Sequence, residues 1–106
     1  MDAKTYYDWV GHTLDTPHEH TSRQDALTHF ALGLNGEVGE VTELIKKELY
    51  SDCHKKRNEE MEPVIGELGD VMWYLTALCQ TYGITLEEVM QHNYNKIVGR
   101  FGPSVK

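Results

Sequence analysis

The sequence has few of the residues that mark a secreted, membrane-bound or zinc-binding protein. Its 106 residues include two cysteines, Cys53 and Cys79, whose spacing fits no zinc site, so we interpret both as reduced thiols of a cytoplasmic protein. No apolar run approaches the roughly 20 residues that a membrane-spanning helix needs. The first residues lack the basic and then apolar order of a signal peptide. We therefore expect a protein with no membrane partner.

Basic residues are also scarce. Lys and Arg together number 10 against 17 Asp and Glu, which gives a formal net charge of −7. Because a nucleic-acid-binding surface needs a stripe of basic side chains, this balance argues against such a partner. A small phosphorylated substrate stays open, since a bound cation would reverse the local charge.

Strand-like alternation of apolar and polar residues is missing, whereas helical periodicity is strong. We expect helices over residues 5–13, 22–50, 63–82 and 86–100, with a polar and basic loop over residues 51–58 between the two long helices. The predicted fold class is therefore all-α, with residues 1–106 forming one domain, an antiparallel helical bundle. One chain offers only two long helices and one of medium length. We expect oligomerisation to complete the bundle, as a homodimer or a homotetramer.

Residues that start and stop helices lie where the periodicity changes. Ser22 suits the N-cap of the first long helix, and Pro63 suits the first turn of the second. Gly83 can end that second helix in a left-handed conformation. Thr85 and Glu88 have the spacing of a capping box, which would start the last helix.

Each long helix carries an apolar stripe that we expect to form the core, centred on Leu34 in one and on Leu68 in the other. Glycines accompany these stripes, although glycine inside a helix costs roughly 1 kcal/mol relative to alanine. They are Gly33, Gly36, Gly39, Gly66 and Gly69. Two interpretations stay open: close approach of a ligand or helix to nearby carboxylates, or simple packing between helices.

Two acidic pairs flank the stripes, Glu37 with Glu40 and Glu67 with Asp70. Because three residues correspond to about 300° of rotation, each pair projects from nearly one side of its helix. No Lys or Arg lies four residues further on, where Val41, Leu44, Val71 and Tyr74 stand instead. Such a cluster is costly without a cation, and its hard oxygens suit Mg²⁺ or Mn²⁺. A solvated acidic face is the competing interpretation.

The runs Gly-Glu37-Val-Gly-Glu40-Val and Gly-Glu67-Leu-Gly-Asp70-Val resemble the signature of the MazG family of all-α nucleoside triphosphate pyrophosphohydrolases. The resemblance implies an enzyme that hydrolyses (deoxy)nucleoside triphosphates, with Mg²⁺, to the monophosphate and pyrophosphate, for clean-up or control of the nucleotide pool. It also implies that these four carboxylates are the catalytic metal ligands.

The same resemblance implies phosphate ligands on the last helix, where Asn93, Lys96 and Arg100 match. They lie within about 60° of one another on a helical wheel and would present an amide and two cations. The alternative explanation is a polar helix end, where Lys96 and Arg100 interact favourably with the negative end of the helix dipole. Tyr74, one turn after Asp70, is a further substrate-binding candidate or a residue at the core boundary.

Aromatic and histidine side chains give weaker indications. We expect Trp73 to be exposed, because it projects about 140° from the apolar stripe. A subunit interface is the favoured explanation for such a side chain, and a platform for a base is the alternative. Trp9 is expected in the core, with base stacking as the alternative. His18 and His20 lie where the resemblance implies a base pocket, although two histidines in a polar loop are more often simply solvated.

Two other functions would use residues of the same types. A catalytically silent helical module in a regulatory role would use the same apolar and glycine-rich faces to bind a partner. A di-iron carboxylate bundle would need Glu-x-x-His pairs, and none of the six histidines follows a Glu at that spacing. The sequence therefore favours the pyrophosphohydrolase, with the silent module as the alternative.

Overall fold

The computed structural model describes residues 1–14, 22–50 and 57–102, without the side chains of residues 57–60. Its elements are α1 (Ala3–Leu14), α2 (Arg23–Tyr50), α3 (Arg57–Tyr82) and α4 (Leu86–Phe101). All regular structure in these ranges is helical, which confirms the all-α prediction. No helix in the same ranges is long and apolar enough to cross a membrane.

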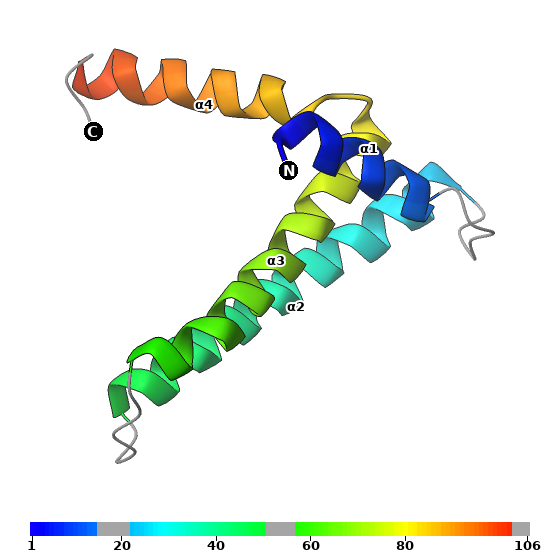
Figure 1. Ribbon diagram of the computed structural model, residues 1–106. Helices are drawn as coiled ribbons and strands as arrows, with labels where there is room; N and C mark the ends of the chain where they lie inside the picture. Colours follow the sequence, from blue (N-terminus) through cyan, green and yellow to red (C-terminus); the bar gives the residue numbers. More distant parts are fainter. Residues whose placement is uncertain (15–21, 51–56, 103–106) are drawn as a thin grey trace.

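The two long helices, α2 and α3, form an antiparallel hairpin (Figure 1). α1 packs across the end of this hairpin where α2 begins and α3 ends. α4 leaves the same end, contacts α1, and then runs away from the hairpin. Within the described residues the arrangement is therefore open, with a third helix covering only one end of the hairpin.

Most predicted helix boundaries are confirmed, because they depend on residues within one turn. The Ser22 hydroxyl accepts a hydrogen bond from the Asp25 N–H at 3.1 Å. Thr85 and Glu88 form the capping box in both directions. Gly83 has a φ of 73°, the left-handed conformation expected at the end of α3.

The predicted start of the second long helix was wrong. α3 begins at Arg57, so Pro63 lies inside the helix rather than in its first turn. The residues before Pro63 include good helix formers, which extend the helix backwards although the proline removes one backbone hydrogen bond. The loop predicted over residues 51–58 falls largely on residues 51–56, which lie outside the described residues.

A small apolar core joins α1 to the covered end of the hairpin. Val10, Phe30 and Ala77 form it, one from each of α1, α2 and α3. Gln80 adds a polar link, because its Nε2 donates a hydrogen bond to the Tyr7 carbonyl oxygen at 2.9 Å. Cys79 is buried and free, as expected. Cys53 lies outside the described residues.

The apolar stripe of α3 is covered only in part, so the expectation that it forms the core holds in part: Cys79 is buried, and Val71 and Leu75 are partly buried. Leu68 and Met72 are each 49% exposed, and Ile65 is 65% exposed. The helices also meet along the neighbouring flank, where Gly33 lets an aromatic ring approach the α2 backbone. Ile65, Leu68 and Met72 are left uncovered in the described part of the chain. Completion of the bundle by a second copy stays a prediction.

Candidate active site

The hairpin brings three of the four predicted carboxylates together. Glu37 from α2 and Glu67 and Asp70 from α3 each offer an oxygen, and these oxygens all lie within 4.8 Å of one another. Glu37 and Glu67 are partly buried, whereas Asp70 is exposed. Glu40 is exposed and does not belong to this group. We call Glu37, Glu67 and Asp70 the carboxylate group.

The electrostatics of the group are unfavourable for three negative charges. Burial raises the pKa of Glu37, and the charge of Asp70, a proton shared with Glu67 and the charge of Glu40 raise it further. In the described part of the chain, no Lys or Arg forms a salt bridge with the group. The group therefore either holds a proton or needs a cation. Three clustered carboxylate oxygens are a donor set that suits Mg²⁺ or Mn²⁺.

The glycines next to the carboxylates do not serve packing within the described chain. A Cβ added at any of four of them would meet no heavy atom within 4 Å; they are Gly36, Gly39, Gly66 and Gly69. Gly33 differs, because a Cβ there would lie 2.5 Å from Cζ and 2.6 Å from Cδ1 of Tyr74. Packing between α2 and α3 thus explains Gly33 alone.

Tyr74 lies in the interface between the two long helices, partly buried. Its ring contacts Trp73 edge-on at 5.1 Å between centroids and His29 at 6.2 Å. Trp73 is itself partly buried and packs edge-on against Phe30 at 6.0 Å. The expectation of an exposed Trp73 was therefore wrong, because α3 turns this side towards α2 rather than towards solvent.

α1 contributes one aromatic residue near the group, Tyr6, with Trp9 beside it. Trp9 is 49% exposed and lies tilted against Tyr6 at 5.7 Å, so its predicted core position was wrong. Burial and then the charge of Asp70 raise the pKa of Tyr6. Sequence reasoning missed Tyr6 as a neighbour of the site. No local signal shows where a short first helix packs, so only the tertiary structure could find it.

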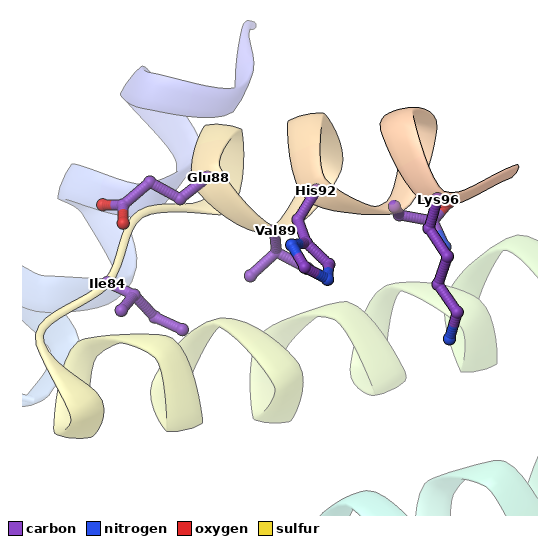
Figure 2. Close-up of a pocket in the computed structure, with 6 residues that line it drawn as sticks. Ile84, Glu88, Val89, His92 and Lys96 are labelled. Carbon is purple, nitrogen blue, oxygen red and sulfur yellow. The ribbon is translucent and has the colours of Figure 1, made fainter. Parts of the chain in front are cut away.

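The predicted phosphate ligands are separated from the carboxylate group within one chain. Asn93 and Lys96 line an open cavity of about 450 Å³ along α4; the other lining residues are Ile84, Glu88, Val89 and His92. Figure 2 shows Val89, His92 and Lys96 projecting from one side of α4. Arg100 is exposed further along the same helix. Because α4 runs away from the hairpin (Figure 1), the structure does not join the two halves of the predicted site.

The histidine candidates His18 and His20 lie outside the described residues.

Comparison with known protein families matches residues 26–103 to the MazG nucleotide pyrophosphohydrolase domain. The matched region contains all four acidic residues of the two pairs, Tyr74 and all of α4. α1 lies before it.

Two relatives give weaker guidance. The gene 37 protein of Mycobacterium phage L5 is 36% identical over 76 residues, which are 72% of this chain and 67% of that protein. The uncharacterized protein YvdC of Bacillus subtilis (strain 168) is 29% identical over 70 residues, 61% of this chain and 66% of that protein. The chain thus spans about two thirds of each, and neither name states an activity. No solved structure matches the chain.

Proposed function

The chain belongs to the MazG nucleotide pyrophosphohydrolase domain family, and from this premise we propose that it hydrolyses (deoxy)nucleoside triphosphates to the monophosphate and pyrophosphate. The observation that carries the proposal is the carboxylate group, whose oxygens lie within 4.8 Å of one another across two helices. The proposed role is clean-up or control of the nucleotide pool in the cytoplasm. We include α1 in the same domain, because Val10 packs into the core of the hairpin.

The donor set and its charge support a divalent cation as the cofactor. Glu37, Glu67 and Asp70 would hold Mg²⁺ or Mn²⁺, and rotation of the exposed Glu40 side chain would add the fourth ligand. When bound, the cation would neutralise the triphosphate and lower the pKa of a water molecule. A carboxylate oxygen not engaged by the cation would orient that water or accept its proton.

The phosphate-binding residues are the second part of the proposal. Asn93, Lys96 and Arg100 would donate to the phosphate oxygens, Arg100 bidentately. Tyr74, one turn from Asp70, would contact phosphate or sugar. Since α4 runs away from the hairpin in one chain, we propose that the ligands on α4 reach the carboxylate group of a second copy. A homodimer or homotetramer would then share its active sites across an interface.

The uncovered apolar side chains support this assembly. Ile65, Leu68 and Met72 form an exposed apolar surface on α3, and the open glycines leave the neighbouring backbone accessible. Exposed apolar patches of this kind mark interaction sites in soluble proteins.

The proposal is tested by incubating the purified protein with a panel of NTPs and dNTPs, with and without Mg²⁺, and measuring pyrophosphate and orthophosphate separately. Pyrophosphate in equal amount to the monophosphate, only with the cation, is the expected result. Orthophosphate alone, or no product from any nucleotide, would contradict the proposal.

The exposed apolar stripes also favour a second candidate, a catalytically silent module that binds a partner protein. This alternative predicts a melting temperature that neither Mg²⁺ nor nucleotide changes, because neither would bind the folded state. A rise in melting temperature with the two together would exclude it.

A further inference from the structure

Gly33 makes an unusually close approach to the partner helix. A Cβ at this position would lie closer than 3.0 Å to ring atoms of Tyr74, a separation that real Cβ atoms essentially never show. The ring has little freedom to move aside, because Trp73 and His29 contact it and Tyr74 packs against the core. Any residue other than glycine at position 33 must therefore displace the ring or separate the helices.

This contact lies one helical turn from the carboxylate group on both helices. Glu37 follows Gly33 by four residues in α2, and Asp70 precedes Tyr74 by four residues in α3. Because the helices run antiparallel, one turn of about 5.4 Å leads from the Gly33 contact to the level of Glu37 and Asp70. The separation of the two backbones at the contact thus governs their separation at the carboxylates.

We propose that Gly33 is a positioning residue for the divalent-cation site. By letting the Tyr74 ring lie against the α2 backbone, it sets the distance at which carboxylates from two helices share one cation. The inference rests on the proposed function in one respect, that the carboxylate group binds a divalent cation. The inference goes beyond the acidic pairs, because it assigns to Gly33 an effect on the affinity and selectivity of cation binding.

The size of the cation makes the inference specific. Mg²⁺ requires near-octahedral oxygen ligands at about 2.0–2.1 Å, whereas Ca²⁺ accepts a flexible shell at about 2.3–2.6 Å. Separating α2 from α3 by a fraction of an ångström should therefore weaken Mg²⁺ binding more than Ca²⁺ binding. A general loss of folding would weaken both alike, so the ratio of the two affinities distinguishes positioning from a structural role.

The test is a calorimetric titration of the metal-free full chain with MgCl₂ and, separately, CaCl₂. Gly33→Ala should lower Mg²⁺ affinity roughly tenfold or more, the range seen when groups supporting metal ligands are changed. Ca²⁺ affinity should fall less. Gly36→Ala is the matched control, because it makes the same change in the same helix where a Cβ meets nothing within 4 Å. It should retain Mg²⁺ affinity within about twofold.

A rescue variant separates the contact from the substitution itself. The double variant Gly33→Ala/Tyr74→Leu lacks the ring with which the new Cβ would clash, so it should regain much of the lost Mg²⁺ affinity. The same double variant provides the test if Gly33→Ala alone fails to fold. If wild type binds Mg²⁺ and Gly33→Ala binds it equally well, the positioning inference is wrong while the proposed function stands. Equal losses in Gly33→Ala and Gly36→Ala, or no rescue, also overturn it. No Mg²⁺ binding by wild type would overturn both.

Discussion

The two ends of the α2–α3 hairpin differ in how they are packed. At the closed end, α1 covers the hairpin, and Val10, Phe30 and Ala77 are buried together. At the open end, which comprises residues 38–50 of α2 and 57–66 of α3, no described side chain is buried. The carboxylate group lies between the two ends. The stable core and the candidate chemistry thus occupy neighbouring but distinct parts of one hairpin.

The difference follows from the number of helices that meet. Two helices can bury only the strip along which they touch, whereas a third helix encloses side chains from all sides. Val10 is 0% exposed because α1 supplies that third helix. The open end has apolar residues of the same kind, with Ile65 65% exposed, and no third helix in the described chain to cover them. The open end therefore exposes apolar side chains that the proposed assembly would cover.

The largest expected effect is a loss of stability at the closed end. Phe30→Ala should cost about 3–5 kcal/mol of unfolding free energy, because it leaves a cavity in a small core. Ile65→Ala at the open end should cost under about 1 kcal/mol in dilute protein, where its side chain stays exposed. Urea unfolding of both variants measures the difference. Equal losses would show that the open end is packed as tightly as the closed end.

A second effect concerns the group between the two ends. Asp70→Asn should lower turnover at least about a hundredfold, because cation stabilisation of the transition state is worth several kcal/mol. Glu62→Gln is the matched control, since Glu62 is an exposed acid of α3 outside the group, and it should keep near wild-type turnover. Circular dichroism should show unchanged helix content in both. Loss of helicity in Asp70→Asn would mean that the carboxylate is structural.

The assembly proposed for the open end predicts a third effect. Ile65→Glu should weaken self-association by roughly 2 kcal/mol, about thirtyfold, because the new charge would be buried in the interface. Gln24→Glu, an exposed position near the start of α2, should leave association unchanged. Sedimentation at micromolar concentration measures both. A wild-type monomer would remove the proposed reason for the uncovered apolar surface.

The smallest effect is the pH dependence of metal-free stability. The raised pKa of Glu37 means that the folded state favours the protonated carboxyl group. The contribution of Glu37 to folding stability is therefore complete below the pKa that it has in the unfolded chain, and it is lost as pH rises through its pKa in the folded state. Metal-free Glu37→Gln should therefore melt higher than wild type at neutral pH and similarly in acid. Adding Mg²⁺ should reverse the order at neutral pH. A constant difference at all pH values would show that the charge of Glu37 is not responsible.

Local features of the fold were largely predictable. The capping box of Thr85 and Glu88, the left-handed Gly83 and the all-α class depend on residues within a turn of one another. Pro63 misled because a proline suits a first turn yet is tolerated further inside. The faces of the helices were not predictable in the same way. Trp73 was expected to be exposed and packs against Phe30, because the side that α3 turns towards α2 depends on contacts between the helices and not on the periodicity of one helix.

By itself, the sequence determined the helices, the two acidic pairs and the family, since each is encoded in short stretches of chain. Only the tertiary structure decided which carboxylates meet. It places Glu37 with Glu67 and Asp70, leaves Glu40 outside the group, and sends α4 away from it. The physical reason is that α2 and α3 pack where Gly33 accepts the ring of Tyr74, a contact between residues distant in sequence that no helical periodicity expresses.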